Sequence, residues 1–212
     1  MRKIGIMGGT FNPVHVGHLM LAEWVRDVLK LNEVWFVPTG SSYMKDSREI
    51  LPGRERLIMT ELAVKDNPLF RCLDIEVMRE GATYSYETLE ALKQTCPEDS
   101  FYFIVGADCL FTIGNWKYPE RIFDSCTLAA AVRGEVSMAE MEDRKRELEE
   151  KFCSQGERIQ LIPFPNIPVS STLIRQRVSR GQSVRYLVPD QVLSYIEEKG
   201  FYREKDESFE KA

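Results

Sequence analysis

The chain has 212 residues, of which 43% are hydrophobic and 29% charged, a composition that is ordinary for globular proteins and excludes disordered and fibrous ones. Its net charge of −5 excludes non-specific attraction to nucleic acid or an anionic membrane, so any polyanionic ligand must be held by a local group of cations. Five cysteines without a Cys-x-x-Cys pair, and no apolar run near the roughly 20 residues of a membrane span, predict a soluble, cytoplasmic protein with reduced thiols.

Short apolar runs rich in β-branched and aromatic residues alternate with helical patterns, which is typical of a parallel sheet with helices on its faces. Strands are expected at Lys3–Met7, Glu33–Val37, within Phe70–Val77, and at Phe101–Val105, Thr127–Val132 and Arg158–Ile162. Helices are expected from Val16, after Pro52, around Thr88–Leu92, and as short terminal helices at Thr172–Val178 and Pro189–Lys199. This order predicts an α/β fold.

Two stretches near the C-terminus are expected to be solvent-exposed. The stretch Glu140–Lys151 mixes acids and bases, which favours a solvated helix over a binding patch. The stretch Arg203–Ala212 is polar and uncapped, so we expect a frayed tail. Because no repeat or low-complexity linker divides the rest, we predict one domain over residues 1–202.

The segment after the first expected strand reads Gly8-Gly9-Thr10-Phe11-Asn12-Pro13-Val14-His15-Val16-Gly17-His18. Glycines let main-chain amides approach an anion, and the following helix points free N–H groups at the carboxyl edge of the sheet, where ligands of open α/β sheets bind. The chain has only two histidines, His15 and His18, and their spacing places both on one helix face, where both can donate to one phosphate. We predict a phosphate site here, formed by Gly8, Gly9, Thr10, Phe11, His15 and His18.

Two alternatives stay open for this segment. The glycines could make only a tight turn while the histidines cap or pack, or the histidine pair could bind a metal. The metal alternative is weaker because the nearest acid, Glu23, lies more than one helical turn beyond His18. The spacing fits neither a dinucleotide-binding fingerprint nor a P-loop.

A second block, Ser170-Ser171-Thr172 followed by Arg175, predicts another phosphate site far along the chain. Either serine can cap the next helix, and the hydroxyls and free amides can donate to an anion. Arg175, one turn into the helix, can fork onto phosphate oxygens. Alone this block would be a common capping motif, and its pairing with the histidine segment gives it weight.

The two blocks resemble the His-x-Gly-His and Ser-Ser-Thr-x-Ile-Arg signatures of the adenylyltransferase and cytidylyltransferase superfamily. From the first strand to Arg175, the chain is similar to the nicotinate mononucleotide adenylyltransferases of bacterial NAD biosynthesis. The resemblance implies a Rossmann-like, doubly wound sheet and an enzyme that joins ATP and nicotinate mononucleotide into nicotinate adenine dinucleotide, releasing pyrophosphate. It implies Mg²⁺ brought by ATP and no nucleic-acid or membrane partner, and it allows a homo-oligomer.

The resemblance also implies roles for individual residues. His18, His15, Lys45 and Arg175 would be catalytic, His18 at the α-phosphate. The other residues implied to bind ATP are Gly8, Gly9, Thr10, Phe11, Gly106, Asp108, Arg133, Ser170, Ser171 and Thr172. The nicotinate nucleotide would meet the Ser85 hydroxyl, the Trp116 ring and the Tyr118 main-chain amide. By themselves, Trp116 could be a core residue, Asp108 a helix cap, and Lys45 and Arg133 surface residues.

The chain departs from the family pattern at three places. Ser85 stands where a threonine is more usual, and it keeps the hydroxyl donor. Ser42-Tyr43-Met44-Lys45 lacks the histidine that often precedes this lysine, and no proline follows Arg133. Selectivity for the acid over the amide form of the mononucleotide stays open, because Ser85 and the amide near Tyr118 favour a carboxylate but would tolerate an amide.

Two rival functions also stay open. Phosphopantetheine adenylyltransferases share both motifs, but they are typically shorter and usually have Thr-x-Gly-His. A non-catalytic nucleotide sensor on the same fold is the second rival, and the intact His15, His18, Lys45 and Arg175 argue against it. The expected mechanism needs no general base, because the attacking phosphate is already an anion near neutral pH.

Overall fold

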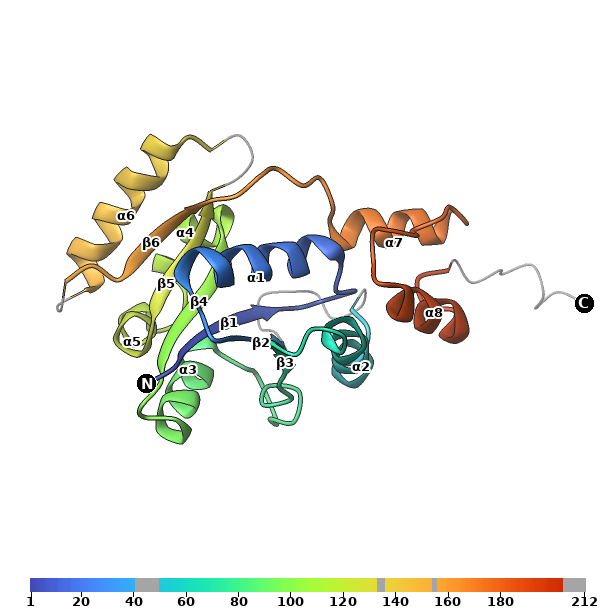
Figure 1. Ribbon diagram of the computed structural model, residues 1–212, viewed down its shortest axis with the longest axis horizontal. Helices are drawn as coiled ribbons and strands as arrows, with labels where there is room; N and C mark the ends of the chain where they lie inside the picture. Colours follow the sequence, from blue (N-terminus) through green and yellow to red (C-terminus); the bar gives the residue numbers. More distant parts are fainter. Residues whose placement is uncertain (41–49, 133–135, 154–155, 204–212) are drawn as a thin grey trace, which may run out of the picture.

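The computed structural model describes residues 1–40, 50–132, 136–153 and 156–203. Its centre is a six-stranded sheet of order β3-β2-β1-β4-β5-β6, in which every neighbouring pair is parallel (Figure 1). The strands are β1 (Lys3–Gly9), β2 (Glu33–Pro38), β3 (Phe70–Cys72), β4 (Ser100–Gly106), β5 (Thr127–Val132) and β6 (Ile159–Pro163). The chain winds outward from β1 in one direction and then from β4 in the other, which is the doubly wound Rossmann order. The predicted fold is confirmed.

Helices cover both faces of this sheet. One hydrophobic cluster, the first cluster, includes residues of α1 (Val16–Leu29), α2 (Gly53–Val64), α7 (Ser171–Ser179) and α8 (Asp190–Lys199). The second cluster lies on the other face, with α3 (Ser85–Thr95), α4 (Ala107–Thr112), α5 (Pro119–Ser125) and α6 (Met138–Phe152). A 3₁₀ turn, η2 (Ile113–Asn115), joins α4 to the segment before α5.

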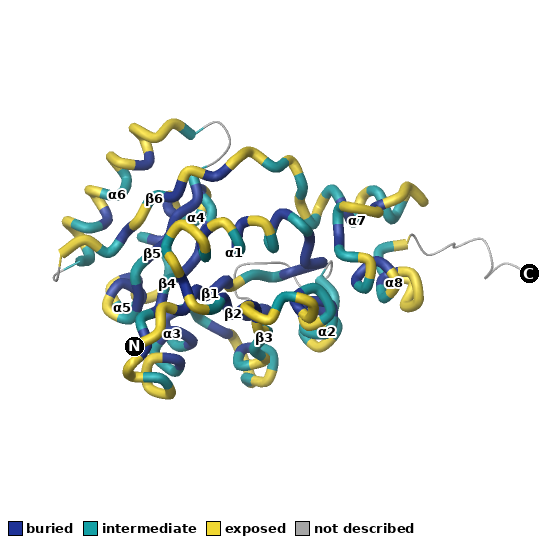
Figure 2. The backbone as a smooth tube through the Cα atoms, in the orientation of Figure 1, coloured by how far each residue is buried: buried dark blue, intermediate teal, exposed yellow. Residues whose placement is uncertain are grey.

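The strands are apolar along their length because both of their faces are buried, as in other parallel sheets. In β1, Ile4 and Ile6 belong to the second cluster and Met7 to the first, which follows the two-residue alternation of a strand. Figure 2 shows the central strands in the colour of buried residues. Each fully buried isoleucine or leucine contributes about 1.5–3 kcal/mol to folding, so the two clusters hold the helices on the sheet.

The expected strands and helices are confirmed, with differences in detail. β3 has only three residues, and the short helices α4 and α5 were not expected. In α2 the buried side chains are Arg56, Met59, Thr60 and Val64, whereas the apolar Leu57, Ile58, Leu62 and Ala63, whose spacing predicted the helix, are only partly covered. Arg56 turns inward because main-chain carbonyls at the sheet edge accept its hydrogen bonds.

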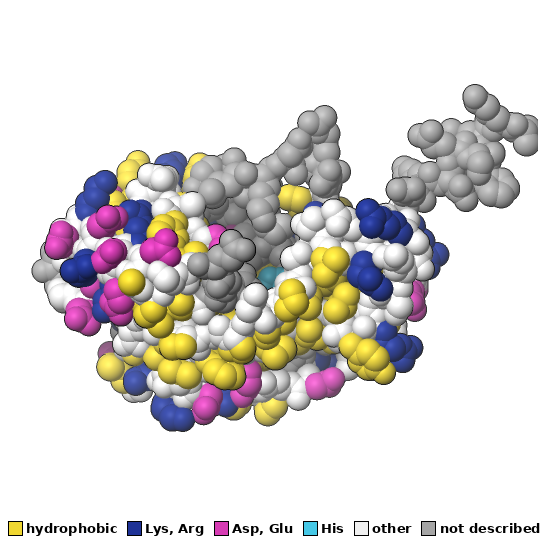
Figure 3. Space-filling view, turned by 90° about the horizontal axis from the view of Figure 1, so that it is seen from above, with side chains coloured by type: hydrophobic (Ala, Val, Ile, Leu, Met, Phe, Trp, Pro, Cys, Tyr) yellow, Lys and Arg dark blue, Asp and Glu magenta, His cyan; other side chains and the backbone are white. Residues whose placement is uncertain are grey.

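Helix α6 is the expected solvated helix. Ser137 caps it and forms a reciprocal capping box with Glu140. Only Met141 and Leu148 of this helix are buried, and Figure 3 shows acidic and basic side chains mixed at that end of the molecule. Of the expected frayed tail, only Arg203 lies within the described residues.

An ion-pair group lies at the amino edge of the sheet, where β1 and β4 begin. Arg2 donates through Nη2 to Asp99 Oδ2 at 2.6 Å and through Nε to Asp99 Oδ1 at 3.3 Å. These hydrogen bonds lower the pKa of the Asp99 carboxyl. Glu33 at the start of β2 pairs with Arg71 of β3 at 2.8 Å. Within the described ranges, no helix combines the length and apolarity that a membrane crossing requires.

Candidate active site

The carboxyl ends of β1 and β4 lie side by side at the point where the winding direction reverses. Ligands of doubly wound sheets bind in the crevice at this switch point. A cavity of about 380 Å³ opens there, lined by Gly8, Gly9 and Thr10 at the end of β1 and by Asp108, Trp116 and Lys117 after β4. The start of the predicted phosphate segment therefore borders this cavity.

The two histidines stack at the start of α1. His15 is the residue before the helix, His18 lies in its first turn, and their ring centroids are 3.6 Å apart at 25°. The main-chain N–H of His15 donates to Nδ1 of His18 at 3.2 Å. Because Nδ1 accepts, the proton of a neutral His18 ring sits on Nε2. His18 is thereby held as a hydrogen-bond donor, and imidazole atoms are visible at the surface in Figure 3.

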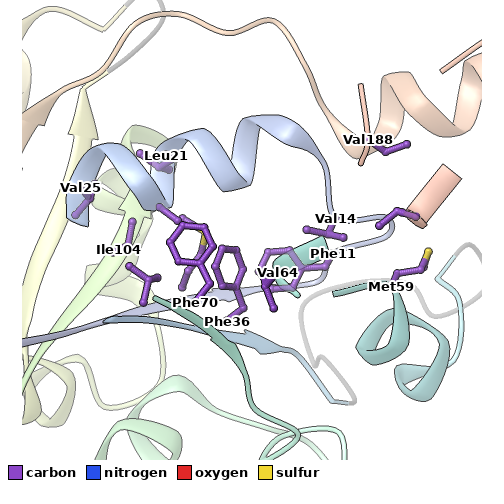
Figure 4. Close-up of a cluster of buried hydrophobic side chains, with 14 of the residues drawn as sticks. Phe11, Val14, Leu21, Val25, Phe36, Met59, Val64, Phe70, Ile104 and Val188 are labelled. Carbon is purple, nitrogen blue, oxygen red and sulfur yellow. The ribbon is translucent and has the colours of Figure 1, made fainter. Parts of the chain in front are cut away.

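The loop that precedes the histidines is anchored in the first cluster. Phe11 is 2% exposed and has φ of 48°, and its ring meets the His18 ring edge-on at 5.0 Å. Figure 4 shows Phe11 and Val14 in the same cluster as Met59 and Val188. A Cβ on Gly9 would lie 2.8 Å from the Phe11 ring, so this turn requires glycine at position 9. The buried Phe11 ring thus holds the loop in place next to the histidine pair.

The structure brings the second predicted block against this loop. Ser170 caps α7 by accepting from the Leu173 amide at 3.1 Å, as expected for one of the two serines. Ser171 Oγ donates to the Pro13 carbonyl at 2.8 Å, and Arg175 Nη1 donates to the Asn12 carbonyl at 3.0 Å. Arg175 Nη2 also lies 3.5 Å from Thr172 Oγ1. The two blocks, more than 150 residues apart in sequence, are thus in direct contact, and of their predicted phosphate residues Gly8, Gly9 and Thr10 line the cavity.

One main-chain amide that was expected to be free for phosphate donates to a carbonyl of the protein instead. The Val16 amide, the first of α1, donates to the Leu187 carbonyl at 3.0 Å. It is therefore not a free N–H of the helix N-terminus, in contrast to the expectation for this helix. Leu187 follows α7 and precedes α8, so the C-terminal part of the chain completes the start of α1.

The residues implied for the pyridine nucleotide gather at the cavity, with one exception. Ser85, the first residue of α3, and the half-buried Trp116 both line it. Trp116 Nε1 is buried with no hydrogen-bond partner among the described residues. Tyr118 precedes α5 with φ of 52°, and its side chain packs edge-on against Tyr86 at 5.2 Å instead of lining the cavity. The role implied for Tyr118 belongs to its main-chain amide and does not depend on this side chain.

The remaining predicted residues fall in three places. Gly106 precedes α4, and Asp108 lies in the first turn of α4, exposed at the cavity. The alternative that Asp108 caps this helix is wrong, because Gly106 is the capping residue and no side chain caps it. Lys45, with the Ser42–Met44 stretch before it, and Arg133 lie outside the described residues. No group of three or more His, Cys, Asp or Glu side chains within the described ranges is placed to hold a metal ion.

Sequence reasoning missed a buried arginine at this edge. Arg56 is 2% exposed and donates to the carbonyls of Thr10 at 2.7 Å, Thr39 at 2.6 Å and Leu51 at 3.0 Å. Burial lowers the pKa of its guanidinium. Three chain segments are joined by one side chain, and no local pattern could have indicated it because the partners are main-chain groups.

A second missed group lines the cavity itself. Glu76 is 6% exposed and accepts from Thr88 Oγ1 at 2.8 Å. Thr83 is 5% exposed, and its hydroxyl has no partner within the described part of the chain. The loop after β2 packs tightly here, since a Cβ on Gly40 would lie 2.2 Å from the Glu76 carbonyl oxygen. The spacing of Thr83, Ser85 and Thr88 around the start of α3 is the sequence signal that could have indicated this wall.

Residues 6–177 match the model of the Cytidylyltransferase-like family. A relative from Lachnoclostridium phytofermentans, named "Probable nicotinate-nucleotide adenylyltransferase", is 42% identical over 202 residues, covering 95% of this chain and 100% of the relative. A relative of the same name from Dehalococcoides mccartyi is 42% identical over 204 residues, covering 96% of this chain and 98% of the relative. The chain belongs to the nicotinate-nucleotide adenylyltransferase family.

Membership of this family confirms the resemblance that the two motifs indicated. The fold agrees as well with a solved structure, "Plasmodium falciparum nicotinic acid mononucleotide adenylyltransferase complexed with NaAD". The TM-score is 0.77 at 20% identity, and the match covers 95% of this chain and 98% of that one. The family match spans both blocks, from β1 to Arg175 and beyond.

Proposed function

We propose that this chain transfers the adenylyl group of Mg-ATP to the 5′-phosphate of nicotinate mononucleotide, giving nicotinate adenine dinucleotide and pyrophosphate. Family membership supports the reaction class, because the relatives are named for adenylyl transfer to a nicotinate nucleotide. The observation that carries the mechanism is the hydrogen bond from the His15 amide to Nδ1 of His18, at the switch point of the sheet. It leaves Nε2–H of His18 as a donor beside the crevice.

The 5′-phosphate attacks the α-phosphorus in line, forming the new P–O bond while the bond to the leaving pyrophosphate breaks. The nucleophile is already an anion near neutral pH, so the site has to supply position and charge stabilisation but no base. In this proposal His18 donates to an α-phosphate oxygen. His15 and the Thr10 and Phe11 amides hold neighbouring phosphate oxygens.

The leaving pyrophosphate is assigned to Ser171, Thr172 and Arg175, together with Lys45. Ser171 and Arg175 support this because both donate hydrogen bonds to main-chain carbonyls of the loop that precedes the histidines. Arg133 is assigned to the ATP phosphates on its charge alone. Bound to ATP, Mg²⁺ would supply neutralisation of phosphate charge and would need few protein ligands, since this ion keeps most of its waters.

The adenosine is assigned to Gly106 and Asp108, and the nicotinate nucleotide to the wall formed by Ser85, Trp116 and the Tyr118 main chain. Two buried donors at this wall, Trp116 Nε1 and Thr83 Oγ1, have no partner among the described residues. A carboxylate or a carboxamide on the pyridine ring could accept from such donors. We therefore place the pyridine end of the substrate in this cavity.

We also propose that the protein works in the cytoplasm. All five cysteines are free thiols, which fits a reducing compartment. Burial raises the pKa of Cys126 to about 12, so this thiol stays protonated and unreactive.

A pyrophosphate-release assay with ATP tests the proposed reaction. Nicotinate mononucleotide, its amide and phosphopantetheine are compared side by side at matched concentrations. Release with nicotinate mononucleotide, at a kcat/KM well above the other two, is expected. A preference for phosphopantetheine, or ATP binding by calorimetry without pyrophosphate release from any acceptor, contradicts the proposal.

A further inference from the structure

Tyr202 follows the last helix, and its side chain reaches back to the loop that precedes the histidines. Its hydroxyl donates to Asn12 Oδ1 at 2.9 Å, across 190 residues of sequence. Asn12 is 4% exposed, and the same oxygen accepts from the Leu51 amide at 3.3 Å. Burial raises the pKa of the Tyr202 phenol, so the hydroxyl keeps its proton and remains a donor near neutral pH.

The main chain adopts an uncommon conformation to place this hydroxyl. Tyr202 has φ of 62°, two residues after Gly200 with φ of 65°. The left-handed region is unfavourable for a residue with a Cβ, and such residues persist where the surrounding structure fixes them. The Phe201 amide donates to the Ile196 carbonyl at 3.1 Å, which holds the turn after α8 against its helix.

Asn12 lies in the sequence between two groups of donors that the proposed mechanism uses, the Thr10 and Phe11 amides and the histidine pair. The Thr10 and Phe11 amides precede it and His15 follows it, so its position sets the spacing between them. Its main-chain carbonyl is held by Arg175 and its side-chain oxygen by Tyr202. Both hydrogen bonds come from residues late in the chain, one to the main-chain oxygen of Asn12 and one to its side-chain oxygen.

We propose that Tyr202 is a positioning residue for adenylyl transfer, which fixes Asn12 and through it the geometry of the phosphate loop. The proposal rests on the proposed function. Tyr202 touches no substrate in it and acts only through the loop. A displacement of reacting groups by about 1 Å can cost about 100-fold in rate, so loss of one tie should show in turnover.

The test is Tyr202→Phe, which removes the hydroxyl and keeps the ring. We expect kcat for pyrophosphate release with ATP and nicotinate mononucleotide to fall about tenfold, the factor that corresponds to one lost hydrogen bond. The KM for nicotinate mononucleotide should change by less than about twofold, because the pyridine wall is untouched. A purely structural role would lower the thermal midpoint without this change in kcat.

Tyr195→Phe is the matched control. Tyr195 lies on α8, and its hydroxyl donates to Glu55 Oε2 of α2 at 2.7 Å. This variant also loses one tyrosine hydroxyl, with a comparable cost in stability, but its partner is not in the phosphate loop. Its kcat should stay within about twofold of the unmodified protein. Unchanged turnover in Tyr202→Phe, or equal losses in the two variants, overturns the proposal.

A second comparison uses the partner residue. In an Asn12→Ala background, Tyr202→Phe should cause no further loss of kcat, because the group it holds is gone. Independent, multiplying losses would show that Tyr202 acts by another route and would overturn the proposal. If the unmodified protein releases no pyrophosphate, the proposed function has failed instead, and the two failures are thereby distinguished.

Discussion

His18 owes its role as a donor to the main chain of a residue three positions earlier. The tautomer of a catalytic histidine is usually set by a carboxylate or carbonyl that accepts from its second nitrogen. Here the second nitrogen accepts instead, from the His15 amide at 3.2 Å. The motif therefore carries its own tautomer control, supplied by the main chain of residue 15. The His15 side chain contributes separately, by stacking on the His18 ring at 3.6 Å between centroids.

His18→Ala should lower kcat by about two to three orders of magnitude, as the loss of one preorganised donor does. The affinity for ATP should change little, because the donor acts on charge that develops in the transition state. Steady-state kinetics together with calorimetric ATP binding measure the two effects. Turnover equal to that of the unmodified protein would contradict the assignment.

Trp116→Ala and Ser85→Ala should raise the KM for nicotinate mononucleotide selectively, because both side chains line the cavity assigned to it. We expect about tenfold for the tryptophan, whose ring is the larger contact. The KM for ATP serves as the internal control. Equal rises for both substrates would show that these residues support the whole crevice and not the pyridine ring.

At the scale of elements, the sequence pattern predicted the strands and long helices well, because both are periodic and strongly apolar. It missed α4 and α5, which are too short to show a period, although Pro119 at the first turn of α5 is a helix-start signal. It also predicted the two phosphate blocks, but it did not predict the hydrogen bonds that Arg56, Asn12 and Tyr202 make around them. Those residues act on main-chain groups or amide oxygens far away in sequence, and such contacts leave no local pattern.

Arg56 joins the ends of β1 and β2 to the start of α2, so its loss should weaken the packing of these elements. Arg56→Met leaves several buried carbonyls without donors and should lower the free energy of unfolding by about 2–4 kcal/mol. Arg54→Met, at an exposed position one half-turn earlier, is the control and should stay within about 0.5 kcal/mol. Urea denaturation measures both, and equal stability of the two variants would contradict the prediction.

At the scale of the whole molecule, the ion pairs of the amino edge lie far from the crevice at the carboxyl edge of the sheet. The amino edge carries the Arg2–Asp99 and Arg71–Glu33 pairs, and the carboxyl edge carries the crevice. The chain as a whole is acidic, and among the described residues that line the cavity the base is Lys117. Changes at the amino edge should therefore alter stability and leave turnover unaffected.

Asp99→Asn provides the test through pH. The folded pKa of Asp99 lies below its unfolded value of about 3.9, so its stabilisation is present above that pH and is lost as pH falls through the folded pKa. The variant should have a lower thermal midpoint at pH 7, and its deficit should shrink below about pH 4. Its kcat at pH 7 should be unchanged. A deficit that stays constant down to pH 2 would contradict this reading of the pair.

The long sequence separation of the ties on the phosphate loop has a consequence for protein synthesis. Ser171 contacts Pro13 across 158 residues. Arg175 and Tyr202 contact Asn12 across 163 and 190 residues, so all three partners follow long after the loop in the chain. A nascent chain can form β1 and the histidine turn early, but it cannot hold them until α7, α8 and Tyr202 have left the ribosome. On the proposed roles, competence for catalysis is thus expected only once Tyr202 has emerged, and a chain cut before it would have the motif without its geometry.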